Sequence, residues 1–226
     1  MTKLDEKWAL TAETVGADGL SVILPLYQLS STVEENILEV ADLLERHGVK
    51  SEIVPVDDGS GDGTDGILSR FQGGEYHGET IRTYAYITFV PVVCRKNSGK
   101  GAALRAGFAA STGRYVMLLD GDLDIHPKQT PYFFEEMVTK AADIVIGSKR
   151  HPRSAVQYPW HRRIVSACYF TFVRLFFGLK VTDTQTGMKL FKRETLGYAL
   201  DRMLVKTYAF DLELLSIAVQ HGAKIA

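Results

Sequence analysis

The sequence predicts an α/β protein with a mostly parallel sheet and helices on both of its faces. Short apolar runs of strand length alternate with segments whose apolar residues recur at helical spacing. Such alternation is typical of strands joined by right-handed helical crossovers. The 226 residues, of which 46% are hydrophobic and 23% charged, have an ordinary globular composition with enough apolar surface for one substantial core. We therefore expect a single domain over 1–226, with 1–19 as a polar N-terminal extension.

The first half of the chain contains three of the expected strands. Residues 20–27 form a short, largely apolar run, which is typical of a strand buried on both faces. Ser31 and Thr32 are suitable N-cap residues, and the apolar residues over 33–44 then recur at helical spacing, which predicts a helix. Two further strands are expected at 53–56 and 87–94.

The second half of the chain continues the alternation. We expect a helix over 100–110, a strand over 115–119, a helix over 131–141 and a strand over 144–146. The apolar stretch 164–179 and the segment 210–221 also have helical character. The last three residues, Lys224-Ile225-Ala226, resemble the start of a strand, so we expect the sequence to be a piece of a longer protein.

Charge, cysteine content and hydropathy exclude several classes of protein. The formal net charge is −1, which argues against a nucleic-acid partner. Cys94 and Cys168 lie far apart and outside a CxxC spacing, which argues against a disulfide framework or a zinc cage. Residues 1–19 lack the apolar core of a signal peptide, and no run of about 18 apolar residues predicts a membrane span. The chain as given is expected in the cytoplasm, either soluble or on a membrane surface.

Two acidic clusters follow expected strands. Asp57 and Asp58 come after the second strand, and Asp120, Asp122 and Asp124 come after the fourth. Ligands of parallel α/β sheets bind at the carboxyl ends of the strands. Three carboxylates with no basic residue beside them in the sequence need a cation, and their spacing does not fit an EF-hand. A single Mg²⁺ or Mn²⁺, held by one or two carboxylates together with substrate phosphates, fits this cluster.

Two glycine-rich loops resemble phosphate-binding motifs without matching them. Residues 61–66 read GxGxxG, but the aspartates in and before this loop would repel a pyrophosphate. The loop is either a tight polar turn or the turn that presents Asp57 and Asp58 to a base or ribose. Lys100 lacks the flanking residues of a P-loop, and it either meets a phosphate at a helix N-terminus or is solvated.

The window 144–182 contains no acidic residue. Such an imbalance in a protein of balanced charge predicts an anion site. The window is also rich in aromatic residues, and basic beside aromatic side chains suit a membrane interface. A core helix with a solvated basic rim is the alternative interpretation, and RNA binding is a third. The basic residues of the window are Lys149, Arg150, Arg153, Arg162, Arg163, Arg174 and Lys180.

Five short motifs occur in an order that resembles glycosyltransferase family two, and within it the polyprenyl-phosphate sugar synthases. They are 25–27 (PLY), 56–60 (VDDGS), 99–102 (GKGA), 119–123 (LDGDL) and 183–191 (DTQTGMKLF). The resemblance covers about 20–226 and implies a GT-A fold, a Rossmann-like, mostly parallel sheet with helices on both faces. In one departure from the family pattern, about four extra residues separate Tyr27 from Glu35 and Asn36.

The resemblance, taken with the patterns above, implies three groups of site residues. Contacts with a nucleotide-sugar are expected from Pro25, Tyr27, Asp57, Asp58, Lys100, Asp120 and Gly121. The metal ligands are expected to be Asp120, Asp122 and Asp124, of which Asp124 replaces the glutamine usual in mannose synthases. The acceptor phosphate is expected at Lys149, Arg162, Arg163, Ser166 and Lys189. The candidate catalytic residues are Asp122 and Arg162.

These residues predict an inverting transfer of a hexose from a UDP- or GDP-sugar to a polyprenyl phosphate, either dolichyl or undecaprenyl, by an enzyme peripheral on the cytoplasmic face of a membrane. An acceptor phosphate with a second pKa of about 6 is largely ionised at neutral pH, so it needs cations rather than a base.

The main alternative is a sugar-hydroxyl acceptor, which needs a base, and Asp211 is then the candidate. Asp211 is expected in the first turn of the last helix, at the edge of the cleft without pointing into it. A third hypothesis is a non-catalytic nucleotide- or RNA-binding module, against which the acidic cluster argues.

Overall fold

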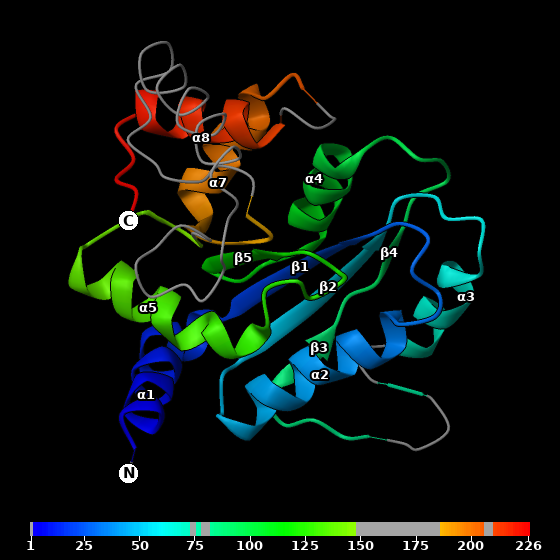
Figure 1. Ribbon diagram of the computed structural model, residues 1–226, viewed down its shortest axis with the longest axis horizontal. Coiled ribbons are helices and arrows are strands. Elements are labelled where there is room, and N and C mark those ends of the chain that lie inside the picture. The colour runs from blue at the N-terminus through cyan, green and yellow to red at the C-terminus, as the bar shows by residue number, and fades with distance from the viewer. Residues whose placement is uncertain (1, 73–75, 78–81, 148–185, 206–209) are drawn as a thin grey trace, which may run out of the picture.

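The computed structural model describes all residues except 1, 73–75, 78–81, 148–185 and 206–209. Within the described part, one sheet of seven strands has the order β3-β2-β1-β5-β7-β6, and β4 also pairs with β2 (Figure 1). The sheet is mostly parallel and helices lie on both of its faces, so the predicted fold class is confirmed.

The parallel part of the sheet contains β1 (Leu20–Leu26), β2 (Ser51–Asp57), β3 (Ile87–Phe89), β4 (Val92–Val93) and β5 (Tyr115–Leu119). β1 lies between β2 and β5 and is buried on both faces, as its apolar run predicts. The expected strand 87–94 is two shorter strands, β3 and β4, separated at Val90 and Pro91. Pro91 has no N–H to donate to β2, so continuous pairing is interrupted there.

Two antiparallel strands complete the sheet. β7 (Met188–Lys192) pairs with β5, and β6 (Ile144–Ile146) pairs with β7. β7 is absent from the sequence-based expectations. Because β7 runs antiparallel to β5, its first residue, Met188, lies opposite Leu119 at the end of β5. The start of β7 therefore lies at the edge of the sheet where the parallel strands end. At the other side of β6, Ile225 forms an isolated parallel bridge with Ile144.

The helices cover the sheet in two groups (Figure 1). On one face lie α1 (Lys3–Val15), α2 (Val33–Arg46), α3 (Thr64–Leu68) and α5 (Thr130–Thr139). On the other face lie α4 (Lys100–Ala110), α7 (Arg193–Arg202) and α8 (Phe210–Gln220). Single turns of 3₁₀-helix are found at Gly16–Asp18, Ser69–Phe71 and Pro127–Gln129.

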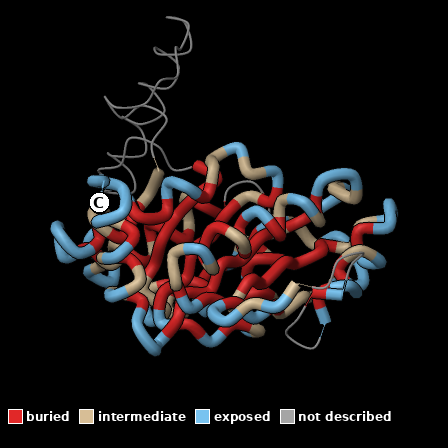
Figure 2. The backbone as a smooth tube through the Cα atoms, turned by 90° about the horizontal axis from the view of Figure 1, so that it is seen from below, coloured by how far each residue is buried: buried red, intermediate tan, exposed pale blue. Residues whose placement is uncertain are grey.

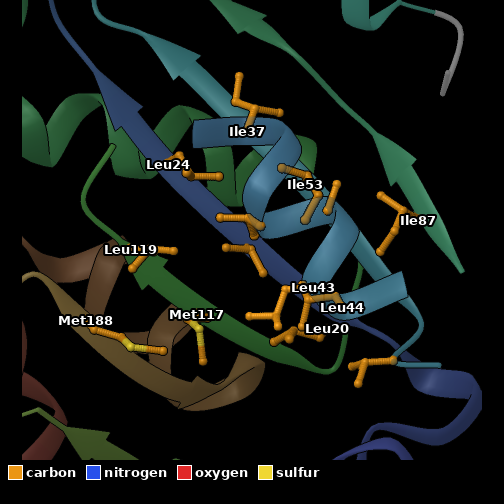
Figure 3. Packing of buried hydrophobic residues seen from close by; sticks show 14 of the residues in the cluster. Leu20, Leu24, Ile37, Leu43, Leu44, Ile53, Ile87, Met117, Leu119 and Met188 are labelled. Carbon is orange, nitrogen blue, oxygen red and sulfur yellow. The ribbon is translucent and has the colours of Figure 1, made fainter. Parts of the chain in front are cut away.

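Each group of helices buries its own hydrophobic cluster against the sheet. Successive side chains of β1 alternate between the two clusters, with Leu24 in one and Ile23 in the other, as the period of a strand requires. In Figure 3, Ile37 and Leu44 of α2 lie over the strand residues Leu24 and Ile53. Buried residues occupy the centre of the molecule and exposed residues its outside (Figure 2).

The segment expected to be a polar N-terminal extension is part of the folded domain. Residues Lys3–Val15 form α1, which begins with a capping box between Thr2 and Asp5 and packs against α5. Trp8 and Val15 are seven residues apart and so lie on the same face of α1, and both are buried in the first cluster. The ring of Trp8 stacks on His47, with 4.2 Å between ring centroids. The polar composition of this segment concealed a narrow apolar stripe.

One local expectation is wrong, and one helix is absent from the sequence-based expectations. Thr32 occupies the N-cap of α2, but its side chain makes no capping hydrogen bond. α7, which follows β7 directly, was not expected. Helices in the described ranges are all too short or too polar to cross a membrane.

Candidate active site

The two acidic clusters meet at one edge of the sheet, as predicted. Asp57 ends β2 and lies opposite Leu26, the last residue of β1. Asp120 follows β5, which pairs with the other side of β1. The carboxyl ends of β2 and β5, on either side of β1, thus carry the two predicted acidic clusters, and this edge is where α/β sheets bind ligands.

Backbone N–H groups hold the carboxylates on the β2 side. Asp57 and Asp58 are only 1% and 4% exposed. Asp57 accepts a hydrogen bond from the Ser60 N–H at 3.1 Å. Asp58 accepts from the N–H groups of Ser98 and Gly99 at 2.9 and 2.8 Å. Asp58 therefore fixes the loop that leads into α4, and its predicted contact with a nucleotide remains a prediction.

The chain after Tyr27, where the family pattern is about four residues shorter, is hydrogen-bonded to the segment that follows β2. The Ser60 hydroxyl accepts from the Gln28 N–H at 2.9 Å. Asp62 accepts from the Ser30 N–H at 2.9 Å and from the hydroxyl of Thr64, the first residue of α3, at 2.7 Å. The hydrogen bond from Ser30 is the main reason that the pKa of Asp62 lies well below its usual value. The loop 61–66 is thus a polar turn with a structural role.

Tyr27 and Pro25 border this part of the site. The Tyr27 side chain is 47% exposed, and Pro25 lines a small pocket with Lys100 and Asp120. Their predicted role in binding the donor nucleotide requires such accessible side chains and stays a prediction.

Lys100 is the basic neighbour that the sequence did not place beside the acidic cluster. It is the first residue of α4, and its ammonium forms an ion pair with Asp120, although the two are 20 residues apart. The ammonium also lies 6.0 Å from the centroid of the Phe210 ring. No basic residue stands beside the acidic cluster in the sequence, but α4 and β5 bring Lys100 to Asp120 through the fold.

Asp120 is held firmly in place by its surroundings. Its N–H donates to the Gly187 carbonyl at 2.8 Å. A Cβ added at Gly187 would lie 2.9 Å from the Asp120 Oδ2, so this glycine permits the close approach of β7. Gly121 is similarly confined, since a Cβ there would lie 3.0 Å from the Pro25 carbonyl oxygen. The Asn36 side chain donates to the Gly121 carbonyl at 2.8 Å.

The three aspartates do not form a ready cage for a metal. Asp122 accepts a hydrogen bond from the Asp124 N–H at 3.2 Å, across the left-handed Leu123. Among the described residues, no group of three or more His, Cys, Asp and Glu side chains could together hold a metal ion. The hard oxygen donors of Asp120 and Asp122 nevertheless fit Mg²⁺ or Mn²⁺, which need only one or two carboxylates when a diphosphate supplies further ligands. A role for Asp124 as a third ligand stays a prediction.

Behind Asp120 lies a buried ion pair. The Lys189 ammonium on β7 is 2.6 Å from the Asp211 carboxylate on α8, and the two side chains are only 4% and 9% exposed. Lys189 also donates to the Thr186 carbonyl at 2.8 Å. Burial raises the pKa of Asp211, and the nearby charge of Lys189 opposes this shift.

The ion pair changes the expected roles of both residues. Lys189 was expected to receive the acceptor phosphate, but its ammonium is engaged with Asp211 and Thr186. Asp211 was expected to stand at the edge of the cleft. Instead it is buried and lines the same small pocket as Lys100 and Asp120.

The remaining residues predicted for the acceptor site belong to a part of the chain that the structure does not describe. Lys149, Arg162, Arg163 and Ser166 lie outside the described residues, as do the predicted helix 164–179 and most of the acid-free window.

Asn36 and Phe210 are site residues that sequence reasoning missed. Asn36 lies on α2 after the four-residue insertion, so its contact with Gly121 is recognisable from the family pattern only once that insertion is allowed for. Phe210 lines the pocket beside Lys100. No signal in the sequence distinguishes it from an ordinary core aromatic.

Comparison with known proteins identifies the family of this chain and agrees with its fold. The family model of Glycosyl transferase family 2 matches residues 21–198. The chain belongs to this family. The resemblance inferred from the five motifs is therefore confirmed, and the prediction of a glycosyltransferase is confirmed at the level of the family.

Curated relatives point in the same direction. Dolichyl-phosphate beta-glucosyltransferase of Homo sapiens is 29% identical over 211 residues, covering 88% of this chain and 62% of that protein. The Saccharomyces cerevisiae protein of the same name is 27% identical, covering 91% and 64%. Glycosyltransferase AglD of Haloferax volcanii is 27% identical, covering 95% and 33%. The chain thus spans less than two thirds of the length of these relatives.

Solved structures of the GT-A type share the fold. Glucosyl-3-phosphoglycerate synthase of Mycobacterium tuberculosis, in complex with Mn²⁺, UDP and phosphoglyceric acid, has a TM-score of 0.66 and 22% identity, covering 100% of this chain and 72% of that one. Mannosyl-3-phosphoglycerate synthase of Rubrobacter xylanophilus has a TM-score of 0.57 and 21% identity, covering 86% and 58%. The predicted GT-A fold is confirmed.

Proposed function

We propose that this chain is the catalytic domain of an enzyme that moves a hexose from a nucleotide diphosphate sugar to a polyprenyl phosphate. Two of its relatives are named for transfer of glucose to dolichyl phosphate, which supports a lipid phosphate acceptor and favours a glucosyl donor. The donor nucleotide is UDP or GDP, and the polyprenol is dolichol or undecaprenol. The lipid acceptor places the reaction at a membrane surface, on its cytoplasmic side.

One observation carries the choice of a phosphate acceptor. Asp211, the candidate base for a hydroxyl acceptor, is buried and paired with the Lys189 ammonium at 2.6 Å. This carboxylate is therefore already engaged by the Lys189 ammonium, although it lines the same small pocket as Lys100 and Asp120. The nearby Glu213 accepts hydrogen bonds from the backbone N–H groups of Leu204 and Val205. An acceptor that is already ionised needs no base, which fits a site where the carboxylates of Asp211 and Glu213 already have partners.

The donor diphosphate is proposed to bind at the exposed end of β5. Asp120 and Asp122 would hold Mg²⁺ or Mn²⁺, which neutralises charge that develops on the departing nucleoside diphosphate. Lys100, at the N-terminus of α4, adds a cation beside the same oxygens, and the N–H groups of the first helical turn favour an anion. Tyr27, Pro25 and the backbone near Asp58 then border the nucleoside.

The acceptor is proposed to attack from the opposite face of the sugar. Attack by a phosphate oxygen on the anomeric carbon, with departure of the nucleoside diphosphate, inverts the configuration at that carbon. The phosphate needs positioning and charge neutralisation rather than deprotonation. Lys149, Arg162, Arg163 and Ser166 remain the predicted acceptor-phosphate residues.

A transfer assay with matched acceptors tests this proposal. The chain would be incubated with UDP-glucose or GDP-mannose and Mn²⁺, with dolichyl phosphate, undecaprenyl phosphate, the corresponding free polyprenols, glucose or phosphoglyceric acid as acceptor. We expect product only with the lipid phosphates, and no product in EDTA. Equal transfer to a free polyprenol, a free sugar or phosphoglyceric acid would contradict the phosphate-acceptor assignment.

Asp211→Asn distinguishes a structural carboxylate from a catalytic base. We expect kcat with the lipid phosphate to fall by less than about tenfold, since removal of a general base typically costs about 10²–10⁴-fold. The measurement is kcat at a temperature well below the melting transition of the variant, determined by circular dichroism. A loss in the range typical of a general base, with the fold and donor binding intact, would favour the hydroxyl-acceptor alternative.

A further inference from the structure

Two lysine–aspartate pairs lie side by side at the proposed donor site, and they differ in exposure. The pair Lys189–Asp211 is almost fully buried, whereas the side chains of Lys100 and Asp120 are 40% and 32% exposed. A solvent-exposed ion pair contributes about 0–1 kcal/mol, while a buried pair is costly to separate. Lys100 can therefore leave its partner readily, and Lys189 cannot.

The two members of the exposed pair also differ in freedom. Asp120 is confined by the hydrogen bond of its N–H to Gly187 and by the close contact of its carboxylate with that glycine. Lys100 is anchored at its backbone, where Asp58 holds the preceding Gly99, and beyond its pair with Asp120 the ammonium has the Phe210 ring 6.0 Å away. Its four-carbon side chain has several rotatable bonds. Any exchange of partners therefore moves the ammonium while the carboxylate stays in place.

We infer that Lys100 exchanges its partner during donor binding, from the Asp120 carboxylate to the diphosphate, and thereby couples metal binding to nucleotide binding. This inference rests on the proposed function, because it concerns the same donor site. A divalent cation on Asp120 repels an ammonium held by the same carboxylate. The diphosphate supplies the negative charge that the displaced ammonium needs. The proposed diphosphate site is at the N-terminus of α4, of which Lys100 is the first residue.

The exchange has a thermodynamic consequence. Metal alone must displace Lys100 without offering it another partner, so it binds weakly. Metal together with a nucleoside diphosphate provides that partner, so each ligand strengthens binding of the other by the same factor. Lys100 thus neutralises Asp120 until the metal and the nucleoside diphosphate arrive, and then binds the diphosphate itself.

Binding of Mn²⁺ and UDP to Lys100→Met tests the inference without any turnover. Free Mn²⁺ would be measured by electron paramagnetic resonance, with and without UDP, and UDP affinity by calorimetry at saturating Mn²⁺. We expect Lys100→Met to bind Mn²⁺ alone about three- to tenfold more tightly than wild type. The metal then has no ion pair to break at Asp120 and no ammonium beside it to repel it. UDP should bind about tenfold or more weakly, because a charged hydrogen bond is lost.

Lys96→Met is the matched control, since Lys96 is an exposed lysine in the loop before α4. This control removes the same charge and should change neither affinity by more than about twofold. Unchanged or weaker Mn²⁺ binding by Lys100→Met, with a wild-type melting temperature, would overturn the exchange. A wild-type protein that binds neither Mn²⁺ nor UDP would instead count against the proposed function itself.

Discussion

The two sides of the candidate site are stabilised by different kinds of interaction. On the β2 side, Asp57, Asp58 and Asp62 accept hydrogen bonds from backbone N–H groups of neighbouring loops. On the β5 and β7 side, Asp120 and Asp211 pair with the side chains of two lysines. Backbone donors are fixed by the chain around them, whereas lysine ammoniums sit on flexible stems. The aspartates on the β2 side therefore form a rigid border of the site. On the β5 side, the exposed Lys100 ammonium can change its position when a ligand binds.

The largest expected effect comes from breaking the buried pair on the β7 side. Lys189→Met leaves the Asp211 carboxylate buried without its partner, which is expected to lower the free energy of unfolding by about 3–5 kcal/mol. Urea denaturation measures this loss. Lys192→Met is the control on the same strand, because its pair with Asp143 is partly exposed at 34% and 27% and should contribute only about 0–1 kcal/mol.

A second variant keeps this test decisive. In Lys189→Met combined with Asp211→Leu, no buried charge remains, and most of the lost stability should return. If Lys189→Met costs no more than Lys192→Met, the buried pair is not what holds β7 against α8.

The next largest effect is on transfer activity. Asp122→Asn removes a proposed metal-binding carboxylate, while the amide oxygen can still accept the Asp124 N–H hydrogen bond that shapes the turn. We expect kcat to fall by at least about 10²-fold, as for loss of strong electrostatic stabilisation, with an unchanged melting temperature. Normal turnover by this variant, or by wild type in EDTA, would be incompatible with the metal role.

The rigid border on the β2 side is tested at Asp58. Asp58→Ala removes both acceptors of the N–H groups of Ser98 and Gly99 and is expected to cost about 1.5–3 kcal/mol of stability. It should also weaken UDP binding, since the start of α4 is no longer held. Asp58→Asn retains one oxygen acceptor and should lose less. Equal loss in the two variants would show that the hydrogen bonds do not determine the effect.

The smallest expected effect is a pH dependence at Asp62. The folded-state pKa of Asp62 is depressed, chiefly by the Ser30 N–H. A group with a depressed folded pKa contributes stability above its unfolded pKa of about 3.9 and loses that contribution as the pH falls toward the folded value. The melting temperature of Asp62→Asn should therefore fall less than that of wild type between pH 5 and pH 3. Parallel curves for the two proteins would exclude this contribution.

Much of the core of the fold follows from local patterns. Residues 20–26 and 115–119 are largely apolar runs, and each is a buried strand. α2 and α4 begin within a residue of their expected starts. The prediction failed where the pattern was short or masked by polar residues. α1 has only a narrow apolar stripe among charged residues, and β7 lies in a motif whose glycine and lysine do not resemble a strand.

The sequence by itself determined which aspartates the site contains and at which edge of the sheet they gather. Aspartates directly after apolar strands can only lie at the carboxyl edge of a parallel sheet, so Asp57, Asp58 and Asp120 were placed correctly. The tertiary structure alone decided which charges are paired. Lys100 meets Asp120 across 20 residues of chain, and Lys189 meets Asp211 across 22, because β5, α4, β7 and α8 pack together. Ion pairing depends on distance and burial in space, and neither quantity is encoded in the spacing of residues along a chain.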